Sequence, residues 1–359
     1  MKAYIENNPP VSLLKYLTSP LYSGSNFSNV YLTSRGRDAI QLAIDFLRIQ
    51  NDDLVLLPAL TCDTVSSVFA SNCQTIYYDL NKDYSIRVSV LERFLKENPG
   101  IKLIYIIHYF GFIHHNMPQI SSLCKKYGVI LIEDHAHSAL SDYNEELADI
   151  HIFSFRKLFP TADGGGIRIT HQEIHNKFKF KHKLISNQKG LLIAFKRIAS
   201  LYSNGLRSSV GKLIKHDINR LNNGYSRIDP LPISLFGKGI ISSSDINEIS
   251  AERRKQYLLW NKLIASTPFR PIFPVLYDET VPFGFPIKLQ NSKEIVDHFK
   301  KFNIFLKVNW FELPPNTKKP CPVSHRLAET SVTLPIYPGL KEDHMWFIKD
   351  ELLKYGVPI

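Results

Sequence analysis

The fold is decided by GVILIEDHAHS at 128–138, followed by DIHIFSFRKLFPTADGGGIRI at 149–169. Val129 to Ile132 is a short apolar run rich in β-branched residues, which is typical of a strand buried on both faces. Asp134 follows it directly. Ile150 to Phe155 resembles a second strand, and Lys157 comes within two residues of its end. If these strands are parallel neighbours, Asp134 and Lys157 share the carboxyl edge of a sheet, where open α/β sheets bind ligands.

An acid and a lysine in this arrangement suit pyridoxal phosphate. The lysine amine can hold the cofactor aldehyde as a Schiff base and can carry a proton between the cofactor and the substrate carbon. A carboxylate against the pyridine nitrogen keeps that nitrogen protonated, so that the ring absorbs carbanion charge. We therefore predict that Lys157 is the catalytic residue and that Asp134 is the partner of the pyridine nitrogen.

A phosphate site is predicted nearer the N-terminus. The sequence TSRGR at 33–37 stands directly before an apolar series with helical spacing, from Ala39 to Leu47. Backbone N–H groups at a helix start bind phosphate, and hydroxyl groups assist them. The predicted phosphate cup consists of Ser34, Arg35, Gly36 and Arg37, with Ser154 as a candidate second hydroxyl.

Each signal also has a purely structural interpretation. A lysine after a strand is usually a solvated loop residue, and an aspartate at a strand end is often the N-cap of a helix. The order and spacing of the signals along one chain favour the cofactor site.

With these motifs the sequence resembles the DegT/StrS family of sugar-nucleotide aminotransferases, over most of the chain. Five segments carry the resemblance in the family's order: TSRGRDA at 33–39, PALTC at 58–62, HYFG at 108–111, IEDHAHS at 132–138 and FSFRKLFPTADGG at 153–165. The resemblance implies the α/β architecture of fold type I pyridoxal phosphate enzymes. In that architecture helices flank a mostly parallel sheet in a large domain, and a smaller C-terminal α+β domain follows.

The family's site residues carry over onto these motifs. The resemblance makes Lys157 the Schiff-base lysine, Asp134 the pyridinium partner and Ser154 a phosphate ligand. His137 takes a place close to the cofactor's phenolic oxygen, and Cys62 takes a place where relatives often stack an aromatic ring on the cofactor. Related sugar dehydratases carry histidine instead of the lysine, so Lys157 favours amino transfer.

Further residues are predicted to contact substrate. His108 and Tyr109 belong to the HYFG motif, and the alternative for His108 and His137 is a hydrogen-bonded core histidine. A loose counterpart of the family loop that reaches the neighbouring subunit's site contains Asn223, Tyr225 and Arg227. The resemblance thus also implies a homodimer with sites at the subunit interface.

The implied function is conversion of a nucleotide-linked keto sugar to an amino sugar, with glutamate as amino donor, for a surface polysaccharide or related glycan. Two alternatives stay open. One is a pyridoxal phosphate enzyme with another substrate or another reaction, such as dehydration. The other is a catalytically silent binding or scaffold protein, which Cys62 and the short spacing before Lys157 keep open.

The length of 359 residues suits one large and one smaller domain. From Tyr31 to Thr170 apolar runs alternate with amphipathic stretches, which predicts a mostly parallel sheet, and the predicted large domain is 1–240. The predicted small domain is 241–359. Its expected elements are helices at 243–264, 292–302 and 341–355 and strands at 282–289 and 332–336.

The formal net charge is +11, and most of the excess lies in 171–230, which holds twelve Lys or Arg against three Asp or Glu. Interleaved apolar residues make this connector basic and amphipathic. A solvated connector packed on the large domain is expected; the alternatives are contact with a membrane surface and a site for a phosphate-rich ligand. Nucleic acid is not an expected partner, because no helix-turn-helix, zinc or RNP-type motif accompanies the charge.

The four cysteines lack CxxC spacing and fit reduced thiols in the cytoplasm. No metal is expected, since His114-His115 and the pair His135 and His137 lack the rest of a coordination shell. No signal peptide is recognised, and no apolar run approaches the roughly 20 residues of a membrane span.

Overall fold

The computed structural model describes residues 5–6, 27, 29–170, 228–310 and 312–359. The basic connector up to residue 227 lies outside the described residues. So do the predicted substrate residues Asn223, Tyr225 and Arg227. The predictions for these segments therefore stay predictions.

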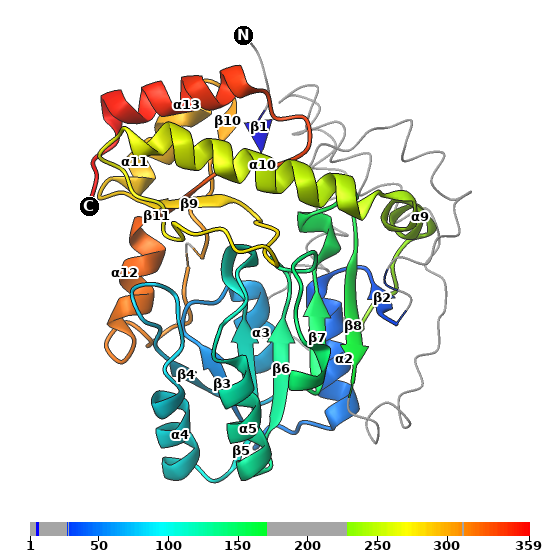
Figure 1. Cartoon of the computed structure of the whole chain (residues 1–359). Helices are drawn as coiled ribbons and strands as arrows, with labels where there is room; N and C mark the ends of the chain where they lie inside the picture. The colour runs from blue at the N-terminus through cyan, green and yellow to red at the C-terminus, as the bar shows by residue number, and fades with distance from the viewer. Residues whose placement is uncertain (1–4, 7–26, 28, 171–227, 311) are drawn as a thin grey trace.

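A seven-stranded sheet occupies the centre of the region from 31 to 169 (Figure 1), in the order β2-β8-β7-β6-β5-β3-β4. The strands are β2 (Tyr31–Thr33), β3 (Leu54–Pro58), β4 (Gln74–Tyr78), β5 (Ile101–Ile107), β6 (Ile130–Asp134), β7 (Ile150–Phe153) and β8 (Gly165–Ile169). Neighbours from β4 to β7 pair in parallel, and β8 is antiparallel to both β2 and β7. The prediction of a mostly parallel sheet is confirmed.

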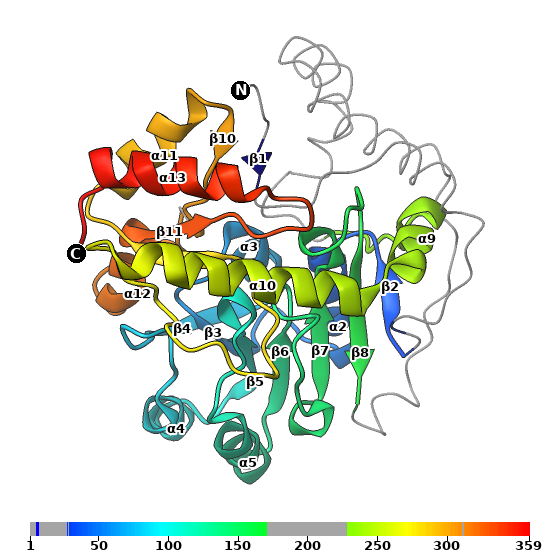
Figure 2. The ribbon, with the colours of Figure 1, turned by 45° about the horizontal axis from the view of Figure 1, so that its top comes forward.

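Helices cover both faces of this sheet, which explains why its central strands are mostly apolar. In β5, every residue except Lys102 is buried, as expected of a strand covered on both faces. One face is covered by α2 (Gly36–Leu47) and α3 (Asp63–Ala70), and the other by α4 (Val88–Glu97) and α5 (Met117–Tyr127), as Figures 1 and 2 show.

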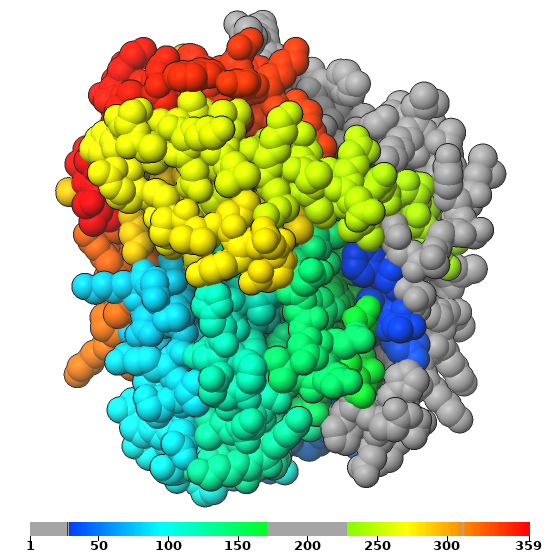
Figure 3. Space-filling view, in the orientation of Figure 1, coloured from blue at the N-terminus to red at the C-terminus, as the bar shows by residue number. Residues whose placement is uncertain are grey.

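The C-terminal part of the chain lies beyond the arrowheads of β6 and β7, at the carboxyl edge of the sheet (Figure 1), and α10 and α13 form much of its surface (Figure 3). Its helices are α9 (Leu235–Ser243), α10 (Ile246–Ala265), α11 (Ser292–Lys300), α12 (Pro322–Thr330) and α13 (Glu342–Tyr355). β9 (Phe285–Lys288) pairs antiparallel with β11 (Ser331–Leu334), and β10 (Ile304–Phe305) pairs with β1 (Ile5–Glu6).

The predicted helix at 243–264 differs from the structure at its start. α10 begins at Ile246, because the side chain of Asp245 accepts a hydrogen bond from the Glu248 N–H and caps the helix. The residues before this cap belong to the separate helix α9. Neither α3 nor α12 was predicted. The domain boundary at residue 240 stays a prediction.

Arg253 of α10 ties the C-terminal part to the carboxyl edge of the sheet. Its side chain is fully buried. The guanidinium donates to the carbonyl oxygens of Pro282 (3.3 Å), Phe283 (3.2 Å), Ile336 (3.2 Å) and Leu158 (3.5 Å). Leu158 follows Lys157 directly, so α10 helps to fix the segment that carries the predicted catalytic lysine. Among the described residues, no helix combines the length and the apolar character needed to cross a bilayer.

Candidate active site

Asp134 and Lys157 meet at the carboxyl edge of the sheet. β6 ends at Asp134, which pairs with Ile152 of the parallel strand β7. A single 3-10 turn, Phe155–Lys157, follows β7 and ends in the lysine. The charges of Lys157 and Asp134 each shift the pKa of the other group, which is consistent with two side chains near one another at this edge, the predicted cofactor crevice.

Asp134 is buried and held in a fixed orientation. The Tyr105 hydroxyl donates to Asp134 Oδ2 at 2.8 Å, and the Ala136 N–H donates to Oδ1 at 2.7 Å. Burial raises the pKa of Asp134, whereas Lys157 and the two hydrogen bonds oppose that rise. A cation brought against this carboxylate, such as a protonated pyridine nitrogen, would favour its ionised form further.

Burial of the Lys157 amine lowers its pKa, while Cys62 and Asp134 act in the opposite direction. A lowered pKa increases the fraction of neutral amine, which is the nucleophilic and basic form. Cys62 is half-buried, and burial raises the pKa of its thiol while Lys157 lowers it. The charges of Lys157 and Asp134 both act on this thiol, and the place of Cys62 beside the cofactor stays a prediction.

His137 lies in the same crevice as a neutral ring. It stacks on Phe283 with 4.1 Å between ring centroids, and its Nδ1 accepts a hydrogen bond from the Phe110 N–H at 3.4 Å. Burial, followed by the charges of Lys157 and Lys307, lowers the pKa of His137 well below its usual value. Because Nδ1 accepts, the proton of the neutral ring is on Nε2, which can donate to an oxygen in the site.

The predicted phosphate cup lies at the start of α2. Arg35 is the N-cap residue, and no side chain caps the helix. A Cβ added at Gly36 would lie 3.3 Å from the Phe153 carbonyl oxygen and 3.8 Å from Ser154 Oγ, so the Ser154 hydroxyl lies beside the first turn. Burial and the charge of Arg35 lower the pKa of Arg37. Two guanidinium groups and an uncapped helix start favour an anion here.

Substitution of Gly165 tests whether the start of α2 binds the phosphate. A Cβ at Gly165 would lie 2.2 Å and 2.4 Å from the carbonyl carbon and oxygen of Arg35, and 2.5 Å from the Gly36 nitrogen. We expect Gly165→Ala to displace the start of α2, to weaken pyridoxal phosphate binding roughly tenfold or more and to destabilise the fold by about 1–3 kcal/mol. Fluorescence titration with the cofactor and thermal unfolding measure the two effects.

Gly100→Ala is the matched control, because a Cβ at Gly100 would meet nothing within 4 Å. It should leave cofactor affinity unchanged. Equal cofactor affinities for Gly165→Ala and wild type would show that the start of α2 does not bind the phosphate.

The residues present fit pyridoxal phosphate: an oriented carboxylate, a lysine with a lowered pKa and an uncapped helix start. The side chains of the two substrate candidates of the HYFG motif make hydrogen bonds within the protein. His108 Nε2 lies 3.1 Å from Glu133 Oε2, and the Tyr109 hydroxyl donates to the Leu60 carbonyl oxygen at 2.8 Å. Both side chains are buried, and their part in substrate binding stays a prediction.

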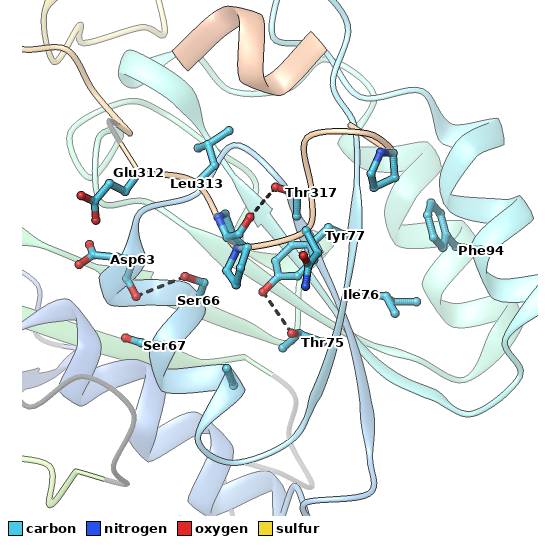
Figure 4. A pocket seen from close by; sticks show the side chains of 15 residues that line it. Asp63, Ser66, Ser67, Thr75, Ile76, Tyr77, Phe94, Glu312, Leu313 and Thr317 are labelled. Atoms are coloured by element: carbon cyan, nitrogen blue, oxygen red, sulfur yellow. Dashed lines mark hydrogen bonds between the residues drawn. The ribbon is translucent and has the colours of Figure 1, made fainter. Parts of the chain in front are cut away.

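A cavity of about 600 Å³ lies along α3, whose N-cap is Cys62 (Figure 4). It lies between α3, β4 and the segment 312–320. Two carboxylates, Asp63 and Glu312, line it together with hydroxyl groups and the apolar surface of Phe94 and several prolines. The sequence offered no signal for this cavity, because its walls are far apart along the chain.

A lysine and an aspartate on adjacent carboxyl strand ends, beside an uncapped helix start, define the fold and site of pyridoxal phosphate-dependent transferases of fold type I. The model of the DegT/DnrJ/EryC1/StrS aminotransferase family matches residues 22–352. The chain therefore belongs to this family, as the motifs predicted.

Three comparisons give the extent of the similarity. The UDP-4-amino-4,6-dideoxy-N-acetyl-beta-L-altrosamine transaminase of Campylobacter jejuni (serotype O:2) is 30% identical over 148 residues, which are 39% of each chain. The UDP-N-acetyl-3-dehydro-alpha-D-glucosamine 3-aminotransferase of Acidithiobacillus ferrooxidans is 24% identical over 86% of this chain and 79% of its own. The match thus spans about two fifths of the length of the Campylobacter relative. The putative sugar aminotransferase Spr1654 of Streptococcus pneumoniae, solved in a PLP form, superposes with a TM-score of 0.73 at 15% identity over 98% of both chains.

Proposed function

We propose that this protein is a pyridoxal phosphate-dependent aminotransferase that converts a nucleotide-linked keto sugar to an amino sugar for a surface polysaccharide or related glycan. The observation that carries the proposal is the pairing of an oriented, buried Asp134 with Lys157 in one crevice. The names of the Campylobacter and Acidithiobacillus relatives, both of which refer to UDP-linked sugars, support this substrate class.

Each residue of the crevice has a role in this proposal. Pyridoxal phosphate, when bound, supplies an aldehyde carbon and an electron-accepting ring that carry an amino group from donor to acceptor. Asp134 keeps a proton on the ring nitrogen. Lys157 Nζ would hold the aldehyde and, as the free amine, would move a proton between the cofactor carbon and the substrate carbon. His137 Nε2 donates to the phenolic oxygen, and the start of α2 binds the phosphate.

The donor half-reaction is the direct test. The protein is saturated with pyridoxal phosphate, its visible absorption is recorded, and glutamate, the proposed donor, is added. We expect the visible band to disappear while about one 2-oxoglutarate per subunit is released, and a keto-sugar nucleotide should then restore the band. A folded protein that binds the cofactor but shows no change with any amino donor would contradict the proposal and favour the silent binding protein.

We propose that the cavity beside Cys62 receives the sugar or ribose of the substrate, because carboxylates accept hydrogen bonds from hydroxyl groups. Replacing Asp63 with asparagine or Glu312 with glutamine should raise KM for the sugar nucleotide roughly tenfold and leave kcat nearly unchanged. Steady-state kinetics at varied sugar nucleotide separates the two constants. The exposed residue Asp52, changed to asparagine, is the control for a lost surface charge. Unchanged KM in both cavity variants would place the substrate elsewhere.

We also propose that the chain works as a homodimer in the cytoplasm. The family resemblance supports the dimer, and the loop with Asn223 and Arg227 is its proposed contribution to the neighbouring site. Three buried free thiols, Cys73, Cys124 and Cys321, fit a reducing compartment. Sedimentation equilibrium measures the mass in solution, and a monomer at micromolar concentration would contradict the dimer.

A further inference from the structure

Four ionisable side chains meet behind the proposed cofactor site. Glu133 precedes Asp134 in β6, so its side chain points to the opposite face of the strand. Around it lie three histidines from the adjoining strands and turns, and at most 2% of any of the four side chains is exposed. The members of this Glu133 cluster are His108, Glu133, His135 and His151. None of them belongs to the amino-transfer mechanism proposed above.

Three of these side chains have the spacing of metal ligands. His135 Nε2 lies 3.1 Å from Glu133 Oε2 and 3.1 Å from His151 Nδ1, and His151 Nδ1 lies 3.8 Å from Glu133 Oε2. A triangle with these sides has a centre about 2 Å from all three atoms, which matches the bonds that zinc makes to imidazole nitrogen and carboxylate oxygen.

The outer nitrogens of both rings are oriented as in metal-bound histidines. His151 Nε2 donates to the Glu145 carbonyl oxygen at 2.9 Å, so His151 Nδ1 presents its lone pair to the cluster. His135 Nδ1 lies 2.9 Å from Ser138 Oγ, which can accept its proton and leave the lone pair on Nε2. Such hydrogen bonds on the far side of the ring fix the tautomer that binds metal.

Glu133 supplies an independent observation. Its Oε1 is buried and has no hydrogen-bond partner among the described residues. A buried carboxylate with an unpaired oxygen is costly, and a cation bound to the same carboxylate would offset the charge that burial disfavours. His108 orients the same carboxylate: its Nδ1 accepts from the His114 N–H at 3.3 Å, so its proton lies on Nε2, 3.1 Å from Glu133 Oε2.

We propose that Glu133, His135 and His151 bind a divalent transition metal ion, with zinc as the best match to two imidazoles and one carboxylate. The competing arrangement is a metal-free hydrogen-bonded cluster, which would keep one negative charge buried without a cation. The sequence predicted no metal, because the pair His135 and His137 lacks the rest of a coordination shell. In the structure, the parallel register of β6 and β7 places Glu133 opposite His151, and these two residues complete the proposed ligand set. The ion would hold the ends of these strands together.

Metal content of the full chain tests the proposal. The protein is expressed with added zinc, freed of loosely bound metal on a chelating resin and measured by inductively coupled plasma mass spectrometry. We expect about one zinc ion per subunit, a fall in the thermal midpoint when a strong chelator removes it, and recovery on adding zinc chloride. Anomalous diffraction at the zinc edge should give a peak between the three ligands.

Two substitutions and a matched control identify the ligands. His151→Phe and Glu133→Gln should lower zinc content at least about tenfold. His114→Phe should retain zinc, because His114 is a buried histidine beside the cluster whose Nε2 donates to the Ile107 carbonyl oxygen. Wild-type protein with less than about a tenth of an ion per subunit, and no thermal shift with zinc, overturns the proposal. If a variant fails to fold, the wild-type content and the anomalous peak still decide it.

Discussion

Replacing Lys157 with alanine is expected to lower kcat/KM for amino transfer by at least about 10³-fold. Alanine removes both the amine that binds the cofactor aldehyde and the base that moves the proton. Neither Asp134, which would face a cationic nitrogen, nor His137, whose pKa is lowered well below its usual value, replaces that base. Formation of 2-oxoglutarate at saturating pyridoxal phosphate measures the loss.

The same variant should keep its fold and much of its cofactor affinity, since Asp134 and the start of α2 are unchanged. Thermal unfolding and cofactor titration check this. Arg156→Ala is the control, because Arg156 stands next to Lys157 in the same 3-10 turn and lowers its pKa. It should change the rate only modestly. Full turnover by the Lys157 variant would refute the assignment of the catalytic residue.

The elements that carry Asp134 and Lys157 were predictable because their signals are local. β6 and β7 each contain a short apolar run that the sequence shows, although β6 continues through Glu133 to Asp134 and β7 ends at Phe153 rather than Phe155. α5 is one of the amphipathic stretches that alternate with the apolar runs; Pro118 lies in its first turn, and Gly128 closes it in the left-handed conformation. Local patterns of this kind determine the ends of elements, and the ends hold the site.

Features that join residues far apart along the chain could not be predicted from the sequence, for a physical reason. The Glu133 cluster depends on the register between β6 and β7, and the cavity depends on the segment 312–320 returning to α3. Tyr105 resembled any buried strand residue, although its hydroxyl orients Asp134. A hydroxyl in the middle of an apolar strand was the one available signal, because a buried Tyr needs a hydrogen-bond partner.

Asp134→Asn is expected to reduce kcat by about 10²–10³-fold while the cofactor stays bound through Lys157 and the start of α2. Asparagine carries no charge, so it does not hold a proton on the ring nitrogen. It also offers one acceptor oxygen to two donors, the Tyr105 hydroxyl and the Ala136 N–H, which costs about 1–3 kcal/mol if one donor stays unpaired. Turnover measures the loss of kcat, and thermal unfolding measures the loss of stability.

Tyr105→Phe separates the charge of Asp134 from its orientation. It keeps the carboxylate and removes one hydrogen bond, so the rate at high pH should fall by no more than about tenfold. The Tyr105 bond lowers the pKa of Asp134 against the rise that burial causes. Removing it raises that pKa further, and since activity needs the ionised carboxylate, the acidic limb of the kcat/KM profile should move to higher pH. An unmoved acidic limb, or wild-type turnover in Asp134→Asn, would mean that this carboxylate does not face the cofactor nitrogen.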